Sequence, residues 1–219
     1  MGESAGMIKV GVITGGHVFD VIGFHKLWRR FPDLDCYVQS LEEWAADYSQ
    51  HGQRYDVLVF YNMHTTLPED SPGGKRTRNA IDGLGDGTGI VVFHHGILAF
   101  KNDRVWDEIV GMTDRTIDGY SHDEELAVCV ADPNHAITEG VGNWSVVDET
   151  YDFRDVEGED SRVLMTVDHP NSMSTMAWSR VYGKSRVLNF VFGHDDQAWS
   201  DETFREVLGR GVKWAAGGQ

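Results

Sequence analysis

Two adjacent histidines follow an apolar run in the middle of this sequence. The run Ile90–Phe93 leads directly into His94, His95 and Gly96. A strand that enters a turn needs only the glycine, so the two imidazoles require another explanation. Histidine titrates near neutral pH and commonly binds metals, and a neighbouring carboxylate fixes its tautomer. His94 and His95 are therefore candidates for proton transfer or metal binding.

Similar polar groups follow three other apolar segments. They are GGH at 15–17, NMH at 62–64 and GHDD at 193–196. In a parallel sheet the carboxyl ends of the strands share one edge, where ligands bind in a crevice between loops. We therefore expect these groups to meet in one cleft. Glu149, which lies close to apolar residues in the sequence, is expected to face the same cleft as a base or a ligand.

Two chemistries fit this set of side chains, and the sequence leaves both open. Imidazoles with a carboxylate can hold Zn²⁺ or a similar divalent ion and leave one position for a water that the metal activates. The predicted metal ligands are His17, His94 and His194. A His and carboxylate pair can instead transfer protons without a metal. The predicted catalytic residues are His94, His95, Glu149, His194, Asp195 and Asp196.

Several common signatures of other chemistries are missing. The first loop lacks the GxGxxG spacing of a dinucleotide site, and the sequence has no GxxxxGK[ST] loop and no GxSxG elbow between a strand and a helix. P-loop and serine hydrolase chemistry therefore have no support, and the signal for a dinucleotide site is weak. Cys36 and Cys129 lie far apart without a CxxC pair, and we expect free thiols in a reducing compartment.

Composition narrows the class of partner. The chain has 219 residues, of which 41% are hydrophobic and 25% charged, as expected for one globular domain. Its formal net charge of -16 repels phosphate backbones and anionic lipid, so we expect neither a nucleic acid nor a membrane as partner. We find no signal sequence pattern and no long apolar segment, and we expect a cytoplasmic protein that binds a small molecule. A homodimer would be common for such a fold.

The hydrophobic pattern predicts an α/β fold. Short strands alternate with helical segments in the first half, followed by strand-like pieces without helices and then by a last strand and helix. We therefore predict a flavodoxin-like, doubly wound, mostly parallel sheet with an antiparallel or mixed extension. Residues 1–7 should form a flexible N-terminus, residues 8–217 a single domain, and residues 65–74 a long loop. The predicted strands are 8–13, 35–39, 56–60, 89–94 and 186–192, the extension spans 125–180, and the last helix runs from about 201 to 216.

Several longer stretches resemble those of ThuA-like (trehalose utilisation) domains, a branch of the class I glutamine amidotransferase-like superfamily. They are FHHGILAF at 93–100, NHAITEGV at 134–141, DETYDF at 148–153, MAWSRVYGKSRV at 176–187 and the segment at 192–218 that begins FGHDDQAWSDETF. Ala136 and Ser185 depart from the family pattern, which has Pro and Gly there. Both departures concern loop geometry.

The resemblance implies an inherited active-site position. Amidotransferases of this fold carry a Cys on a strand-to-helix elbow, paired with a His and a Glu after a late strand. Here the elbow falls at His94 or His95, and the late pair falls at His194 and Asp196. Because an imidazole cannot form the thioester used to hydrolyse glutamine, we expect no glutaminase activity.

The resemblance also implies a role in carbohydrate metabolism, with trehalose or a related or oxidised sugar as substrate. The expected activity is that of a sugar hydrolase or isomerase with a His and carboxylate site, with or without a divalent metal. The alternative is a non-catalytic sugar-binding or regulatory domain. A sugar site needs hydrogen-bonding groups and an aromatic wall, and the predicted substrate-binding residues are His64, Trp199 and Trp106. The alternative for Trp199 is a packing residue that anchors the start of the last helix.

Overall fold

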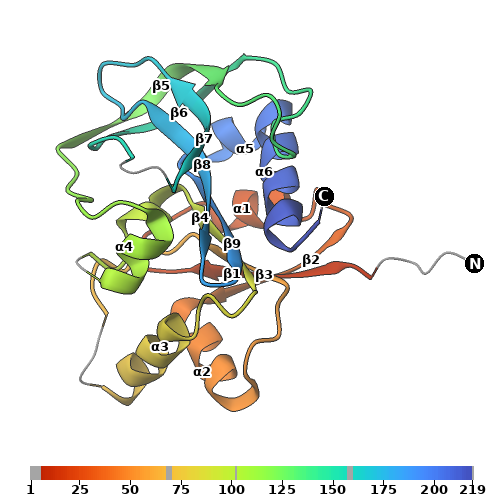
Figure 1. Cartoon of the computed structure of the whole chain (residues 1–219), viewed down its shortest axis with the longest axis vertical. Helices are drawn as coiled ribbons and strands as arrows, with labels where there is room; N and C mark the ends of the chain where they lie inside the picture. The colour runs from red at the N-terminus through yellow and green to blue at the C-terminus, as the bar shows by residue number, and fades with distance from the viewer. Residues whose placement is uncertain (1–5, 68–70, 102, 157–159, 219) are drawn as a thin grey trace, which may run out of the picture.

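The computed structural model describes residues 6–67, 71–101, 103–156 and 160–218. The predicted flexible N-terminus at 1–7 lies outside these residues, except for Gly6 and Met7, which lead into the first strand. The described residues form one mixed nine-stranded sheet in the order β2-β1-β3-β4-β9-β8-β7-β5-β6. Figure 1 shows this sheet in the middle of the molecule with helices on both sides.

The sheet has a parallel part and an antiparallel part. Strands β2, β1, β3, β4 and β9 run parallel to one another, whereas β8, β7, β5 and β6 continue the sheet with antiparallel pairings. The predicted doubly wound sheet with an antiparallel extension is thereby confirmed. The strands are β1 (Ile8–Thr14), β2 (Leu34–Ser40), β3 (Val57–Phe60), β4 (Gly89–Phe93), β5 (Gly119–Val130), β6 (Trp144–Asp152), β7 (Arg162–Val167), β8 (Thr175–Tyr182) and β9 (Ser185–Phe190).

Helices cover both faces of the sheet, with α1, α5 and α6 on one side and α2, α3 and α4 on the other (Figure 1). Every residue of β3 and β4 is buried, as their continuous apolar runs predict for strands covered on both faces. The helices are α1 (Val21–Trp28), α2 (Leu41–His51), α3 (Pro72–Asp82), α4 (Arg104–Val110), α5 (Asp196–Trp199) and α6 (Glu202–Ala215), with a short 3₁₀ helix η1 (His94–Leu98) after β4.

Two helices begin where the sequence pattern is weak. The predicted loop at 65–74 ends earlier, because Pro72 takes the first turn of α3 and the Ser71 hydroxyl accepts a hydrogen bond from the Gly74 N–H at 2.9 Å. Residues 68–70 of that loop lie outside the described residues. The one-turn helix α5 is too short to give a helical period, and Asp195 caps it. The predicted last helix is confirmed as α6.

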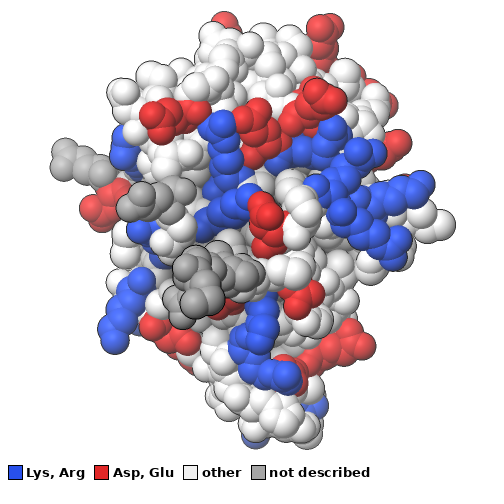
Figure 2. Space-filling model, turned by 90° about the vertical axis from the view of Figure 1, so that its right-hand side faces the viewer, with Lys and Arg blue, Asp and Glu red and all other residues white. Residues whose placement is uncertain are grey.

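Charged side chains of both signs share the surface. Figure 2 shows Lys and Arg side chains gathered toward the upper right of the visible face, with Asp and Glu side chains above and beside them. This mixture agrees with acidic residues dispersed along the chain. None of the helices formed by the described residues has the length and the apolar character that crossing a bilayer requires.

Gly96 allows η1 to pack against β3. A Cβ at this position would overlap the carbonyl oxygen of Phe60, which is backbone and cannot move aside. We expect Gly96→Ala to lower the free energy of unfolding by about 1–3 kcal/mol, because overpacking forces the two segments apart. Urea denaturation measures this change. Gly142→Ala is the control, since a Cβ there meets no atom within 4 Å, and an equal effect in both variants would contradict the explanation.

His135 lies in the connection between β5 and β6 and is buried. Its Nδ1 accepts a hydrogen bond from the Ile137 N–H at 3.2 Å. Burial lowers the pKa of His135, and the positive charges of Arg162 and Arg186 lower it further, against an opposing effect of Asp132. The motif NHAITEGV therefore contains a structural histidine.

The lowered pKa of His135 makes folding stability depend on pH. Below about pH 6.5 the unfolded chain binds a proton at this residue that the folded protein does not bind, so stability decreases as the pH falls. We expect His135→Gln to weaken this decrease. Denaturant titrations of both proteins between about pH 7 and 5.5 measure it, and the same pH dependence in both would argue against this role.

Candidate active site

His94 occupies a strained turn at the end of β4. Its φ is +48°, in the left-handed region that a residue with a Cβ rarely adopts. Such strain persists only where the surrounding structure holds it, and it is concentrated at functional sites. The elbow expected at His94 or His95 therefore lies at His94.

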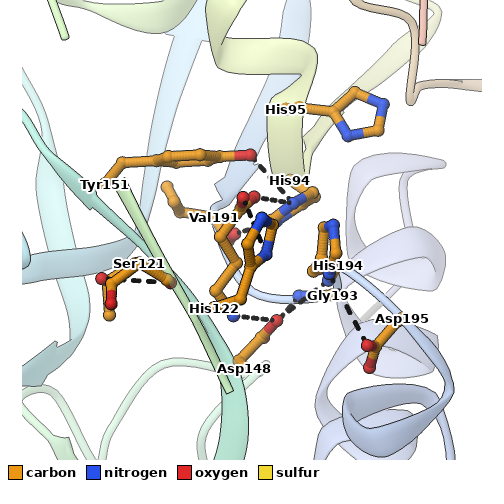
Figure 3. Close-up of polar contacts among 12 residues, drawn as sticks. His94, His95, Ser121, His122, Asp148, Tyr151, Val191, Gly193, His194 and Asp195 are labelled. Atoms are coloured by element: carbon orange, nitrogen blue, oxygen red, sulfur yellow. Dashed lines mark hydrogen bonds and ion pairs between the residues drawn. The ribbon is translucent and has the colours of Figure 1, made fainter. Parts of the chain in front are cut away.

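The His94 ring points into a buried polar cluster (Figure 3). Its Nδ1–H donates to the Val191 carbonyl oxygen at 2.8 Å. Because a carbonyl can only accept, this contact places the other ring nitrogen, Nε2, toward the cluster. Nε2 lies 3.0 Å from Glu149 Oε2 and 2.9 Å from the Tyr151 hydroxyl. The ring itself is fully buried.

Glu149, on β6, connects two histidines. One carboxylate oxygen faces His94, and the other lies 3.3 Å from Nδ1 of His122. Burial alone would raise the pKa of Glu149, but the hydrogen bond and charge of His94 outweigh it and hold the pKa below its usual value. Burial and the nearby Glu149 raise the pKa of Tyr151 well above its usual value, so the phenol stays protonated as a donor.

A β-bulge aims His122 at this cluster. Ser121 pairs with Thr150 and Glu124 with Asp148, so His122 and the intervening Asp123 stand opposite Glu149 alone. Asp123 adopts a φ of +59°. Bulges commonly redirect a side chain next to an active site. The ring of His122 lies 4.7 Å from that of His194 between centroids. The sequence analysis missed this residue, because a bulge has no signature in the surrounding polar segment.

Asp148 holds the turn after β9 against β6. Its carboxylate accepts the Gly193 N–H at 2.6 Å and the His194 N–H at 2.9 Å, together with the Glu149 N–H at 2.9 Å. Burial raises the pKa of this carboxyl group. The Tyr61 hydroxyl also donates to the His194 carbonyl oxygen at 3.0 Å. These contacts fix the backbone that carries His194.

The His194 side chain is held more loosely than its backbone. Its ring centroid lies 5.4 Å from that of His94, and its Nδ1 lies 3.7 Å from Asp195 Oδ2. Burial lowers the pKa of His194, and a positive charge on His94 lowers it further. Figure 3 shows His94, His122 and His194 converging from three different segments.

A cavity of about 270 Å³ opens beside this cluster. It lies just below the range of about 300–1,000 Å³ found for drug-sized ligands, so it suits a small molecule. Tyr120, which is largely exposed, provides an aromatic wall next to His122. The lining residues are His17, Met63, Thr65, Leu98, Lys101, Ile117, Tyr120, His122, Glu149 and Tyr151.

The other predicted site residues occupy different places. His17 lines the cavity, with its ring 4.7 Å from that of His95. His95 is buried and donates through Nε2 to the Tyr61 carbonyl oxygen at 2.7 Å. His64 lies outside the cavity lining, with Nε2 3.5 Å from Glu42.

The two carboxylates that follow His194 also differ. Asp195 caps α5 and is half-buried beside His194. Asp196 is exposed in the first turn of α5. The carboxylate that meets the elbow histidine is Glu149, from β6, and not Asp196 as the late pair implied.

The predicted aromatic wall at Trp199 or Trp106 is wrong. Trp199 is 3% exposed and donates through Nε1 to the Gly193 carbonyl oxygen at 2.9 Å, with its ring packed against Phe24. Trp106 is fully buried and donates to the Gly96 carbonyl oxygen at 3.1 Å. Both are core residues that fix the turns after β9 and β4. Tyr120 and Tyr151 line the cavity instead.

Comparison with solved structures places the fold in a known class. ThuA-like proteins from Parabacteroides merdae and Bacteroides uniformis are 21% and 15% identical to the chain, each with a TM-score of 0.74. The alignments cover 95% and 97% of this chain and 90% and 92% of those proteins. A protein from Thermoplasma acidophilum described as a GMP synthase component is 13% identical, with a TM-score of 0.59 and coverage of 96% and 95%. The fold is therefore shared with ThuA-like proteins and is glutamine amidotransferase-like.

The family follows from the sequence match. The model of the ThuA family, described as trehalose utilisation, matches residues 35–215. The chain therefore belongs to the ThuA family, as the motifs in its sequence predicted. No curated protein matches the chain.

Asp148 offers a test of how the site is held together. In Asp148→Asn the amide nitrogen would face backbone N–H groups, leaving buried donors without an acceptor. We expect the free energy of unfolding to fall by about 1–3 kcal/mol, as for other unsatisfied buried groups. Asp152→Asn, at the exposed end of the same strand, should change stability by less than about 0.5 kcal/mol. Equal stability of Asp148→Asn and the wild type in urea titrations would contradict this role.

Proposed function

We propose that the protein is an enzyme that acts on a small sugar, with His94, Glu149 and His194 as its reactive centre and His122 beside them. The observation that carries the proposal is the contact of the strained, buried His94 with Glu149 at the cavity wall. Membership of the trehalose utilisation family supports a carbohydrate substrate. The cavity volume of about 270 Å³ suits a single sugar ring better than a polymer.

The number of available carboxylates favours isomerisation over hydrolysis. Most glycoside hydrolases use a pair of carboxyl groups on either side of the scissile bond. Among the described residues that line the cavity, Glu149 is the only acid. Its neighbour Asp148 is committed to backbone N–H groups. One carboxylate among imidazoles suits a reaction that moves protons within the sugar.

Such an isomerisation is balanced within the substrate. A base removes the proton from the carbon next to the sugar carbonyl, and the C–H electron pair forms the C=C bond of an enediol. The proton taken from carbon is then added to the former carbonyl carbon. The proton of the adjacent hydroxyl group is transferred to the former carbonyl oxygen, so that the carbonyl and the hydroxyl exchange places. Glu149 and His122 both line the cavity and are the candidate bases.

The walls of the cavity suit the rest of the sugar. Tyr120 offers a ring face to the C–H groups of the sugar, as aromatic side chains do for apolar surfaces. His17, Lys101 and Thr65 offer polar groups for its hydroxyls. Because the elbow carries an imidazole in place of a thiol, the protein should release no ammonia from glutamine.

Deuterium exchange tests the reaction directly. We expect the protein to convert an aldose or ketose in D₂O and to introduce deuterium at the carbon next to the carbonyl, observed by ¹H NMR. Glu149→Gln should lower the rate by about 10²–10⁴, the usual contribution of a positioned acid or base. Glu125→Gln is the matched control, because Glu125 is an exposed carboxylate on β5.

The outcomes separate three interpretations. If the protein hydrolyses a disaccharide without deuterium exchange, it is a hydrolase and the proposed isomerisation is overturned. Sugar binding without conversion would indicate a binding or regulatory domain. Conversion that survives Glu149→Gln would overturn the assignment of the centre.

A further inference from the structure

We propose that His94, Glu149 and His194 bind a divalent transition metal such as Zn²⁺. The inference deepens the proposed function and rests on it for the location of the reactive centre. Metal binding is nevertheless measurable without any sugar. The ligand set differs from the one predicted from sequence, because Glu149 takes the place of His17.

The three donor groups already converge. One ligand atom from each residue lies within 4.8 Å of the other two. In a tetrahedral site, donors about 2.1 Å from one ion lie about 3.4 Å apart, so the longest separation has to shorten by at most about 1.4 Å. The His194 side chain can supply this movement, since it forms no hydrogen bond to any other described residue and is half-buried. His94 and Glu149 are already 3.0 Å apart.

His94 is oriented as metal-binding histidines usually are. A metal-binding imidazole commonly donates its second N–H to a carbonyl or carboxylate, which fixes the tautomer and the ring. His94 donates through Nδ1 to the Val191 carbonyl oxygen at 2.8 Å. Nδ1 of His194 faces Asp195 Oδ2 at 3.7 Å. At His94 the contact with Val191 points Nε2 at Glu149 and the Tyr151 hydroxyl, and an ion would take the place of the contact with Tyr151.

The charge around the site also favours a cation. Glu149 and Asp195 bring two carboxylates to the cluster, and no Lys or Arg among the described residues forms an ion pair with either of them. Their charged neighbours are imidazoles, with His94 and His122 next to Glu149 and His194 next to Asp195. Buried carboxylates are usually hydrogen-bonded, paired with a positive charge or bound to a metal. A divalent ion would balance this charge.

The cavity side of the site leaves room for substrate. Three protein ligands with an open position are typical of catalytic rather than structural zinc sites. Glu149 lines the cavity, so the open position would face it. We therefore infer that the substrate carries a carbonyl next to a hydroxyl, two oxygens that one metal can bind together. With Glu149 on the metal, His122 becomes the group that carries the proton.

Calorimetry on metal-free protein tests the proposal. We expect protein purified without an affinity tag and treated with a chelator to bind one Zn²⁺ per chain. Co²⁺ bound in place of Zn²⁺ should give the visible absorption bands of a four-coordinate cobalt ion. His194→Ala should weaken Zn²⁺ binding by more than about 100-fold, since contacts beyond the ligands alone contribute about 10- to 100-fold. Glu149→Gln should have a similar effect, and circular dichroism verifies that both variants fold.

Two control variants make the assignment specific. His17→Ala should leave Zn²⁺ affinity unchanged, because His17 lies against His95 and outside the ligand set. His51→Ala removes an exposed histidine on α2 near Asp47, where adventitious binding is plausible. A loss of affinity in either control, or no stoichiometric binding by the wild type, would overturn the proposed site.

The metal and the reaction can fail independently. If the protein does not bind Zn²⁺ and converts sugar equally well after chelation, the metal site is overturned and the proposed enzymatic reaction stands. Stoichiometric Zn²⁺ binding without conversion of any sugar would support the metal site and overturn the reaction.

Discussion

The buried carboxylate of Asp148 is the interaction on which the site depends. It joins the antiparallel extension of the sheet to the turn after β9, in the parallel part, through the N–H groups of Gly193 and His194. This link fixes the separation of Glu149 and His194 together with the hydrogen bonds that Tyr61 and Trp199 donate to the same turn. The neighbouring position on β6 then presents Glu149 to His94. Asp148, which has a structural role, thus positions the neighbouring Glu149, to which we assign a role in the reaction.

The elbow at His94 keeps a strained geometry although its chemistry has changed. Its positive φ places the imidazole at the end of β4, and Val191 determines which nitrogen faces the cluster. In glutamine amidotransferases the corresponding elbow carries the nucleophilic Cys. An imidazole there can bind a metal or transfer a proton, but it cannot carry an acyl group. The fold therefore retains the position of a reactive group in a protein that we expect to lack glutaminase activity.

The fold could be predicted from the sequence because its signals are local. Each signal can be read without reference to the others. Continuous apolar runs predict β3 and β4, and a one-sided apolar face predicts α6. The lack of helical patterns between 125 and 180 predicts the antiparallel extension. The predicted loop at 65–74 includes the first turn of α3, because this helix begins in a polar Pro-Gly-Gly segment, and α5 was not predicted, because it is a single turn.

The site was only partly predictable, because it is assembled from distant segments. His94, Glu149 and His194 were among the candidates, since each follows or lies within a strand. Their grouping depends on strand order, which the sequence does not reveal. His122 is directed by a bulge that exists only when β5 pairs with β6. Trp199 turns into the core because α5 directs it inward, so it packs there and forms no wall of the cavity.

The most direct measurement is a crystal structure of the protein with a bound sugar and Zn²⁺, using anomalous scattering to locate the metal. The account predicts one metal peak between His94, Glu149 and His194, with the sugar in the adjacent cavity against Tyr120 and its carbonyl oxygen directed at the metal. A sugar bound at another surface, or a cavity sugar whose carbonyl points away from Glu149, would contradict it.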